Sequence, residues 1–540
     1  MKTATKFFER FPKYALAALQ WEPSGVEPAD VSAWRASQDL SRIEVFYVFG
    51  LSQTAYIEVS DWLHAHPERR LVFLEENTGT IARLVEEGAT LFDDPQVDFA
   101  YLPPGKAADA LIQELAEQYP AKRIEIAALP AKQSERFRRL RLALLRKTTL
   151  SHALFLDRLH GYQPFENFIR NVPHLQRAFY ANAMKGAFSN IPAIVCGAGP
   201  SLKKAIAWLK ELEGRALVIA GGSTLAALSA AGYEPHFGMA IDPNLEEYRR
   251  FRNSFAFECP LLISTRVFPA IFNTCNGPFG YLRSGIGGAA ELWFEEELGL
   301  SDPLLGEHLS EESISVTAIA LAFAQHIGCN PILLSGVDLA YTGGQRYAPG
   351  VSDEKMGLKE LDVEKSAADR ILRRKDKQGR TVYTAVRWLM EASSIAHYAR
   401  KHPEICWINT TEGGLSIQGL QEMSLEAASS LYLNRQWDLR GKVAQQIALC
   451  PMPLQPSHML PSLRESLERV IGHLEVLAER KRGSKALAEF EMKEELATSV
   501  LFYDMPKVLN QALARQTGAA EKAKWLLYLE TARKYAQMFR

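Results

Sequence analysis

The sequence has few cysteines, almost no net charge and no C-x-x-C pair. The 62 Lys and Arg residues nearly cancel the 63 Asp and Glu residues, so no overall field attracts nucleic acid or an anionic membrane, and we expect no nucleic-acid partner. The scattered cysteines exclude a zinc ribbon and a disulfide framework, and they predict reduced thiols in protein cores. There are six: Cys196, Cys259, Cys275, Cys329, Cys406 and Cys450.

Apolar runs long enough to span a bilayer are also missing. One of the longest apolar stretches, VTAIALAFA at 316–324, has about half the length that a bilayer span requires. The first 21 residues contain no apolar signal core, because Glu9, Arg10 and Lys13 interrupt them. These features predict a cytoplasmic protein without a membrane span.

The chain has 540 residues, 47% hydrophobic and 23% charged, which is typical of a soluble globular protein with two or three domains. Between about 40 and 130, apolar strands alternate with helical patterns, which predicts a parallel, doubly wound sheet. Its first turn, VFGLSQ, lacks the spaced glycines of a dinucleotide site, which favours a scaffold domain without a cofactor. A second alternating block begins near Ile191, and only helical patterns follow about residue 455. We therefore predict an α/β protein with three domains, at 1–165, 166–435 and 436–540.

Four connecting segments carry further predictions. RFRRLRLALLRK, 136–147, predicts a linker helix with a solvated basic face, or alternatively a surface for an acidic partner. The polar stretch 343–383 is typical of a lid or an irregular insertion. Thr384 is expected to cap the next helix, and the Ser462–Glu465 spacing predicts a capping box at the start of another.

Glycine-rich turns follow the predicted strands of the second block. CGAGPSL places Gly197, Gly199, Pro200 and Ser201 between a strand and a helix, where N–H groups and a helix dipole can bind phosphate. This turn is neither a G-x-G-x-x-G fingerprint nor a Walker A loop, so it is a weak motif by itself.

Five further polar turns follow strands or begin helices in the same block. In parallel sheets such turns meet at one edge, where ligands bind, so together they predict a nucleotide pocket. Their residues are Gly221, Gly222, Ser223 and Thr224; Asp242; Ser313, Ser315 and Thr317; Asp338 and Tyr341; and Asn409, Thr411, Glu412, Gly413 and Gly414.

These motifs resemble the motility-associated factor (Maf) flagellin glycosyltransferases. The resemblance rests on CGAGPSL, AGGSTLAAL, the Asp of FGMAID, SISVTAIALAFAQHIGCNPILLSGVDLAY and NTTEGG, in order from about 190 to 420. It implies a Rossmann-like N-terminal domain, a sialyltransferase-like central domain and a C-terminal helical domain. The chain differs from the family's common pattern at Pro235-His236, Ser313 and Val337.

The activity implied by the resemblance is transfer of a nonulosonic acid, of the pseudaminic or legionaminic type, from a CMP-activated donor to Ser or Thr hydroxyls of flagellin. We expect Gly197, Gly199, Ser201 and Ser315 to contact the phosphate, and Asp242 and Asn409 to orient the ribose or base. The same predicted nucleotide site includes Pro200, Gly222, Ser223 and Thr411. Asp338, Glu412 and Tyr341 are the candidates for acid–base chemistry, with Asp338 preferred.

Two other functions remain open. No D-x-D motif demands a metal, and we expect no cofactor besides the donor substrate. A hydroxymethylpterin-type pyrophosphokinase is the alternative enzyme, and it would use Mg²⁺ held by carboxylates such as Asp242 and Asp338. The third possibility is a flagellin-binding factor without turnover.

Overall fold

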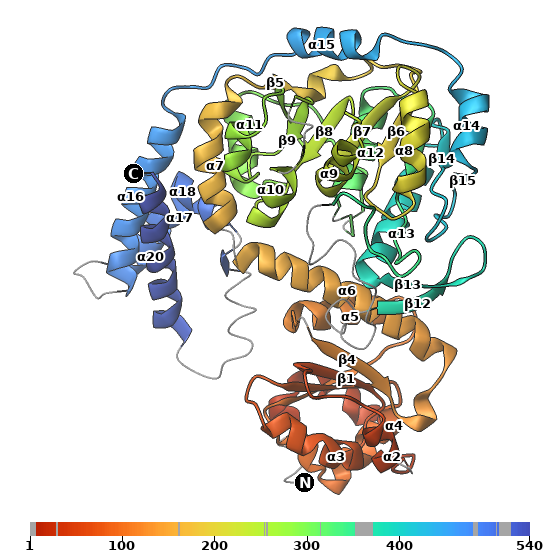
Figure 1. Cartoon of the computed structure of the whole chain (residues 1–540). Coiled ribbons are helices and arrows are strands. Elements are labelled where there is room, and N and C mark those ends of the chain that lie inside the picture. Colours follow the sequence, from red (N-terminus) through yellow and green to blue (C-terminus); the bar gives the residue numbers. More distant parts are fainter. Residues whose placement is uncertain are drawn as a thin grey trace. The chain divides into compact units, whose positions relative to one another are not determined.

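The protein forms two compact units in a computed structural model (Figure 1). The first contains Met1–Asp157, and the second contains Arg158–Lys507 with Gly518–Arg540. The structure describes residues 7–28, 31–121, 123–159, 162–252, 254, 258–310, 312–313, 315–351, 371–478, 484–503, 505–506 and 520–539.

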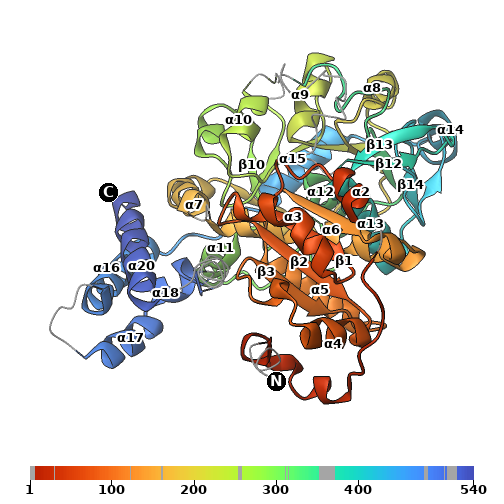
Figure 2. The ribbon, with the colours of Figure 1, turned by 90° about the horizontal axis from the view of Figure 1, so that it is seen from below.

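A four-stranded parallel sheet forms the core of the first unit, in the order β3-β2-β1-β4. Helices alternate with the strands, as the sequence predicts, and Figure 2 shows β1, β2 and β3 side by side. The strands are β1 Val45–Phe49, β2 Arg70–Glu75, β3 Val97–Tyr101 and β4 Ile124–Ala128. The helices are α2 Val31–Ala36, α3 Gln53–His64, α4 Thr78–Glu87, α5 Ala107–Gln118 and α6 Glu135–Leu159, with short 3-10 turns η1 Pro12–Tyr14, η2 Ala17–Gln20, η3 Thr90–Phe92 and η4 Pro130–Lys132.

Carboxylates of the protein itself bind the first strand-to-helix turn of this unit. Glu75, which is buried and paired with Lys132 at 2.6 Å, accepts a hydrogen bond from the backbone N–H of Leu51. Glu27 accepts from the hydroxyl of Ser52, which caps α3. These carboxylates accept hydrogen bonds from donors that a bound phosphate would need, which supports a scaffold role for this turn.

The predicted linker helix lies in the first half of α6. Phe137 and Leu144 are buried on one side, whereas the side chains of Arg138 and Arg139 are 74% and 81% exposed and lie near Glu135. This arrangement favours the solvated basic face over a built docking site.

A nine-stranded sheet forms the core of the second unit, in the order β15-β14-β11-β6-β7-β8-β9-β10-β5. All of its neighbouring strands are parallel. From β6 the chain adds strands in one direction as far as β10, and it then adds β11 on the other side of β6, so the strand order reverses there. The strands are β5 Phe179–Tyr180, β6 Ala193–Cys196, β7 Leu217–Gly221, β8 Phe237–Ala240, β9 Leu261–Ile263, β10 Phe279–Tyr281, β11 Ile332–Ser335, β14 Trp407–Asn409 and β15 Gln421–Glu422.

Helices cover this sheet, and the strands between them are almost entirely buried. The sequence predicts all of the longer strands, but not the two-residue edge strands β5 and β15. The helices are α7 Tyr162–Leu175, α8 Leu202–Glu211, α9 Gly222–Ala230, α10 Leu245–Phe251, α11 Gly288–Glu297, α12 Val316–His326, α13 Val386–Lys401, α14 Leu425–Tyr432 and α15 Leu439–Leu449, with 3-10 turns η5 Ala181–Met184 and η6 Pro269–Asn273.

An antiparallel hairpin, β12 Ile371–Lys375 and β13 Thr381–Ala385, occupies part of the stretch predicted as an irregular lid. Residues 352–370 of that stretch lie outside the described residues. The expected helix cap at Thr384 is wrong: Thr384 belongs to β13, and its hydroxyl donates to the carbonyl of Leu339, while Ala385 holds the N-cap position of α13.

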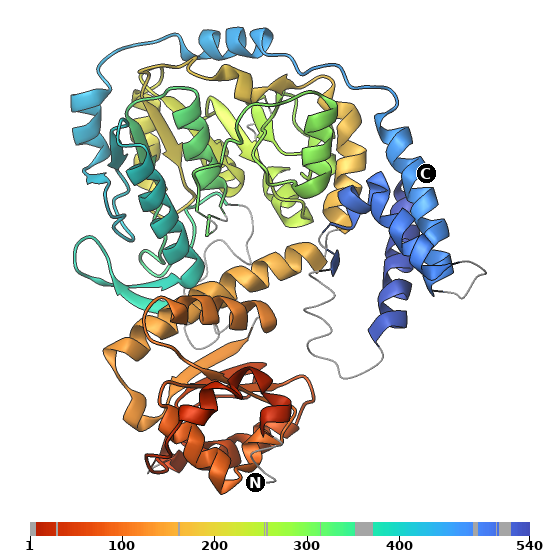
Figure 3. The same cartoon turned by 180° about the vertical axis from the view of Figure 1, so that it is seen from behind.

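Four helices near the C-terminus pack together and on the large sheet's helices. They are α16 Met459–Ala478, α17 Lys485–Glu494, α18 Leu496–Leu501 and α20 Ala520–Met538, drawn in blue in Figure 3. Helix α20 packs on α7, with the rings of Tyr535 and Phe165 4.9 Å apart. The predicted capping box is wrong, because α16 begins three residues before Ser462, whose N–H bonds the carbonyl of His458.

The predicted fold class is confirmed: parallel α/β sheets are followed by a helical segment. All six cysteines are free, as predicted, and only Cys406 is not fully buried. Within the described ranges, no helix has both the length and the apolar character needed to cross a membrane.

Candidate functional site

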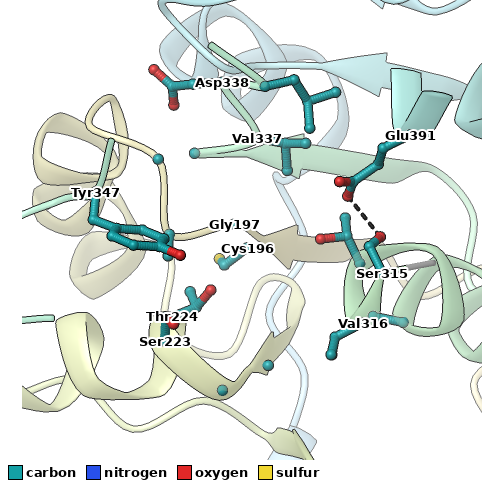
Figure 4. Close-up of a pocket in the computed structure, with 18 of the residues that line it drawn as sticks. Cys196, Gly197, Ser223, Thr224, Ser315, Val316, Val337, Asp338, Tyr347 and Glu391 are labelled. Atoms are coloured by element: carbon teal, nitrogen blue, oxygen red, sulfur yellow. Dashed lines mark hydrogen bonds between the residues drawn. The ribbon is translucent and has the colours of Figure 1, made fainter. Parts of the chain in front are cut away.

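A cavity of about 200 Å³ opens at the carboxyl ends of β6, β7 and β11, where the strand order reverses (Figure 4). This is the position where parallel sheets of this type bind ligands. The lining comes from five of the six predicted turns and from three segments that the sequence did not point to. It consists of Cys196, Gly197, Ala198, Gly199, Gly221, Gly222, Ser223, Thr224, Asp242, Glu247, Arg250, Ser315, Val316, Thr317, Ala320, Gly336, Val337, Asp338, Leu339, Arg346, Tyr347, Trp388 and Glu391.

The glycines of the first turn make room for the neighbouring segment after β11. A Cβ atom at Gly197 would lie 2.6 Å from the carbonyl oxygen of Gly336, and one at Gly199 would lie 2.2 Å from Oδ2 of Asp338. Real Cβ atoms do not approach other atoms this closely, so any side chain here would displace the backbone or Asp338. Close packing within the protein therefore explains these two glycines without a ligand.

Asp338 already occupies the N-terminus of α8. Its carboxylate accepts hydrogen bonds from the hydroxyl of Ser201, at 2.5 Å, and from the backbone N–H of Ser201, at 3.3 Å. Burial raises the pKa of Asp338, and the hydrogen bonds from Ser201 partly oppose that rise. The donors that we expected to bind phosphate at Ser201 thus bind a carboxylate instead. Ser201 and Pro200 line a second cavity, of about 490 Å³.

The second glycine turn presents the N–H groups at the start of α9 to the main cavity. Gly222, Ser223 and Thr224 form the first turn of α9, and the N-cap residue, Gly221, has no side chain to satisfy them. A Cβ atom at Gly221 would meet Cγ1 of Val316 at 2.3 Å, so glycine is also needed for packing here. This turn, rather than CGAGPSL, has the geometry of an anion site.

Asp242 lines the cavity after β8, next to a carboxyl that the sequence analysis missed. The backbone N–H of Asp242 donates to Oε2 of Glu247 at 2.7 Å, and Asn244 caps the intervening turn. Glu247 is 3% exposed; burial first and the charge of Asp242 second raise its pKa well above the ordinary value. Arg250, one helical turn further, also lines the cavity.

Ser315 and Glu391 connect two helices at the cavity wall (Figure 4). Ser315 caps α12, and its hydroxyl donates to Oε1 of Glu391, on α13, at 2.7 Å. Burial raises the pKa of Glu391, while hydrogen bonds from Ser315 and Thr317 and the charge of Arg387 lower it. Ser313, in contrast, does not line the cavity, and its hydroxyl has no hydrogen-bond partner in the described part of the chain.

Six of the predicted site residues do not line the main cavity: Pro200 and Ser201, which line the second cavity, and Tyr341, Glu412, Asn409 and Thr411. Tyr341 packs its ring on Trp388 at 5.0 Å, and Glu412 pairs with Lys204 at 2.8 Å beside the second cavity. Asn409 donates to Glu422, and the Thr411 hydroxyl accepts from the backbone N–H of Val337. These contacts give the last four residues a structural role.

Several lining residues were not predicted from the sequence: Glu247, Arg250, Arg346, Tyr347, Trp388 and Glu391. Only Glu247 and Arg250 carried a signal, since they lie three residues apart on the helix that follows Asp242. Arg346 and Tyr347 belong to a polar loop, and Trp388 and Glu391 belong to a helix whose pattern reads as amphipathic. Within the described ranges, no group of three or more His, Cys, Asp or Glu residues is arranged to hold a metal ion.

His236, one of the departures from the family pattern, lies away from this cavity. It precedes β8, at the opposite end of the strand from Asp242, and it is 2% exposed. Its Nδ1 accepts a hydrogen bond from the backbone N–H of Val218 at 3.0 Å. Val337, in contrast, lines the cavity.

Comparison with known proteins gives a family match in the central part of the chain. Residues 166–344 match the model of a family described as 6-hydroxymethylpterin diphosphokinase MptE-like. This match includes β6 to β11 and most of the residues around the cavity.

A solved structure then matches nearly the whole chain. It is described as the structure of the Maf glycosyltransferase from Magnetospirillum magneticum AMB-1, with 14% identity and a TM-score of 0.47, over 99% of this chain and 87% of that one. The motifs between 190 and 420 resemble proteins of the same kind. No curated protein matches the chain in sequence.

Proposed function

We propose that the protein is a glycosyltransferase that moves a nonulosonic acid, of the pseudaminic or legionaminic type, from a CMP-activated donor to Ser or Thr hydroxyls of flagellin in the cytoplasm. The observation that carries the proposal is the cavity at the reversal of strand order, which combines an uncapped helix N-terminus, two arginines and buried carboxyls. The resemblance of the motifs to Maf proteins supports the choice of donor and acceptor.

The reaction needs an anion site and a base. The bond between the anomeric carbon and the phosphate oxygen breaks, and its electron pair leaves with CMP. The acceptor oxygen forms the new bond to the anomeric carbon and gives its proton to a base. We expect the N–H groups of Gly222, Ser223 and Thr224, at the start of α9 in the cavity wall, to stabilise the leaving phosphate through the helix dipole.

Two buried carboxyls line the cavity and are candidates for the base. Asp338 is held by Ser201, and Glu391 is held by Ser315, and burial raises the pKa of both. A carboxyl with a raised pKa is a stronger base near neutral pH. We propose that Glu391 accepts the proton and that Asp338 positions the CGAGPSL turn. Glu412 and Tyr341 are less suitable because they do not line the cavity.

A pyrophosphokinase is the second candidate, and the family match over 166–344 favours it. That reaction transfers diphosphate from ATP and uses Mg²⁺ bound to carboxylates. Asp242 and Asp338 both line the cavity, but the carboxylate of Asp338 is engaged by Ser201. A metal at Asp338 would therefore require its side chain to turn away from α8.

Thermal stabilisation of the purified protein separates these candidates. CMP, CDP, ATP and NAD are added with and without Mg²⁺. A ligand present at 100 times its Kd stabilises the folded protein by about 2.7 kcal/mol. A metal-independent shift with cytidine nucleotides supports the glycosyltransferase, which is then tested with flagellin by mass spectrometry. A shift with ATP and Mg²⁺ alone supports the kinase, and no shift with any nucleotide supports a protein that only binds flagellin.

A further inference from the structure

The loop after β11 folds back over the first glycine turn and carries Arg346 to the cavity. The N–H of Ala348 donates to the carbonyl of Ala198 at 2.9 Å, and Thr342 and Gln345 pair across the base of this loop. Arg346 and Tyr347 lie between these two tethers, and both line the cavity. Backbone hydrogen bonds on both sides of Arg346 therefore fix the position of this part of the loop.

The guanidinium of Arg346 is held by aromatic rings. It lies 5.0 Å from the ring centroid of Tyr347 and 5.9 Å from that of Trp388. The ring of Trp388 also packs on Tyr341. Stacking on two rings orients a planar guanidinium but leaves its edge free for hydrogen bonds.

Arg346 lacks an anionic partner within the described residues. Its side chain is half-buried, its Nε is buried without a hydrogen-bond partner, and no described carboxylate lies within 4 Å to form an ion pair. Three of the carboxyls that line the same cavity accept hydrogen bonds from other groups: Asp338 from Ser201, Glu391 from Ser315, and Glu247 from the backbone N–H of Asp242. A partly buried cation without a counter-ion is costly unless a ligand supplies the negative charge.

We propose that Arg346 is the anion-binding residue of this cavity and that it binds an oxyanion of the ligand. The inference rests on the proposed function for the ligand's class, a nucleotide joined to an acidic sugar. Such a ligand has two oxyanions, the phosphate and the carboxylate of the sugar. A guanidinium matches either one with two parallel hydrogen bonds, which a lysine ammonium cannot form.

The test is the affinity of Arg346→Gln and Arg346→Lys for three probes: cytidine, CMP and CMP-N-acetylneuraminate, measured by calorimetric titration. If Arg346 binds the phosphate, Arg346→Gln weakens CMP by ~10- to 100-fold and leaves cytidine unchanged. If Arg346 binds the carboxylate, only CMP-N-acetylneuraminate is weakened by that factor. Arg346→Lys recovers a minor part of the loss in both cases.

Arg387→Gln is the matched control. Its guanidinium also lies over Trp388, at 5.7 Å, but Arg387 does not line the cavity. We expect this variant to change the affinity for each probe less than threefold. Equal weakening in the two glutamine variants would mean that net charge near Trp388, and not a contact of Arg346, causes the effect, and the proposal would be wrong.

The outcomes of these titrations distinguish the role of Arg346 from the proposed donor class. Unchanged affinity of Arg346→Gln for CMP and for CMP-N-acetylneuraminate, with tight binding by the wild type, overturns the role of Arg346 and leaves the donor class intact. Binding of ATP but not of CMP by the wild type, with ATP weakened in Arg346→Gln, overturns the donor class and keeps the role of Arg346. Absence of binding by every nucleotide overturns both.

Discussion

Asp338 and Ser201 lie 137 positions apart in the sequence, yet Oδ2 of the aspartate and Oγ of the serine are 2.5 Å apart, and the same carboxylate accepts the backbone N–H of Ser201. The carboxylate thereby satisfies a donor at the start of α8 and fixes the turn that joins β6 to this helix. This contact connects two walls of the cavity.

Asp338→Asn tests that connection. An amide has one acceptor oxygen in place of two, and it loses the charge that interacts with the helix dipole, so we expect a loss of about 1–2 kcal/mol of stability. Transfer activity should fall at least tenfold because the turn shifts. Stability is measured by denaturant unfolding and activity by mass spectrometry of flagellin. Full transfer activity in a variant that still binds nucleotide would rule out any role for Asp338.

Gly199→Ala should disrupt the same region sterically. The new Cβ would lie 2.2 Å from Oδ2 of Asp338 and 2.7 Å from the carbonyl of Gly336, and we expect a loss of about 1–3 kcal/mol. Gly472→Ala is the control, since no atom lies within 4 Å of its Cβ and α16 gains helix propensity, so its stability should rise by about 0.5–1 kcal/mol. Thermal melts of the two variants that shift in the same direction would contradict this prediction.

Glu391→Gln should remove catalysis and spare binding. If Glu391 is the base, transfer falls about 10²- to 10⁴-fold while the affinity for CMP changes little. In the wild type, the rate should fall as the pH drops through the raised pKa of Glu391, because the protonated carboxyl cannot accept a proton. A pH–rate profile of Glu391→Gln that keeps this acidic limb would exclude Glu391.

Glu412→Gln should leave transfer activity within about twofold of the wild type. The side chain of Glu412 is 43% exposed and pairs with Lys204 away from the main cavity, and exposed ion pairs contribute little to stability. The measurement is kcat/KM for the nucleotide-sugar donor. A loss of tenfold or more would instead place the acid–base chemistry in the second cavity.

Because of the buried His236, we expect the free energy of unfolding to depend on pH. Burial lowers the pKa of this histidine to about 3 in the folded protein, against an ordinary value near 6.5. The unfolded chain therefore gains a proton first as the pH falls. The stabilisation of the folded state by the neutral His236 is complete above pH 6.5 and is lost progressively as the pH falls toward 3. Between pH 7 and pH 5 the free energy of unfolding falls by about 2 kcal/mol for this reason.

The variant His236→Asn isolates this effect. The oxygen of asparagine can accept the N–H of Val218 in place of Nδ1, and asparagine does not titrate. Free energies of unfolding at pH 7 and pH 5 are compared for both proteins. We expect the wild type to lose about 2 kcal/mol more than the variant; equal losses would show that His236 is protonated in the folded state.

The strands and turns around the cavity are predictable because each strand is a short apolar run that ends in glycine or a polar residue. The carboxyl ends of β6, β7, β8 and β11 were found in this way. Strand order is not encoded locally, so the sequence could not show that β11 lies beside β6. Because β11 pairs with β6, Asp338 reaches Ser201, and its carboxylate accepts the hydrogen bonds that Ser201 was expected to donate to a phosphate.

There are also physical reasons why some residues were not predicted, or were predicted wrongly, from the sequence. Glu391 and Trp388 face the cavity only because α13 packs on α12, and a helical pattern does not show which neighbour its inner face meets. Thr384 was misassigned because β13 continues into α13 without a loop. Asn409 and Thr411 have the polar character of binding residues, but their side chains hydrogen-bond within the protein.

The reversal of strand order at β6 divides the walls of the cavity between two consecutive parts of the chain. Residues between Cys196 and Arg250 form one part of the lining, and residues between Ser315 and Glu391 form the other. A ligand held between them would add to the contacts that these segments already make, among them the pairing of β6 with β11 and the hydrogen bond between Ser201 and Asp338. Its binding should therefore slow amide hydrogen exchange in both segments together, including strands that it does not touch.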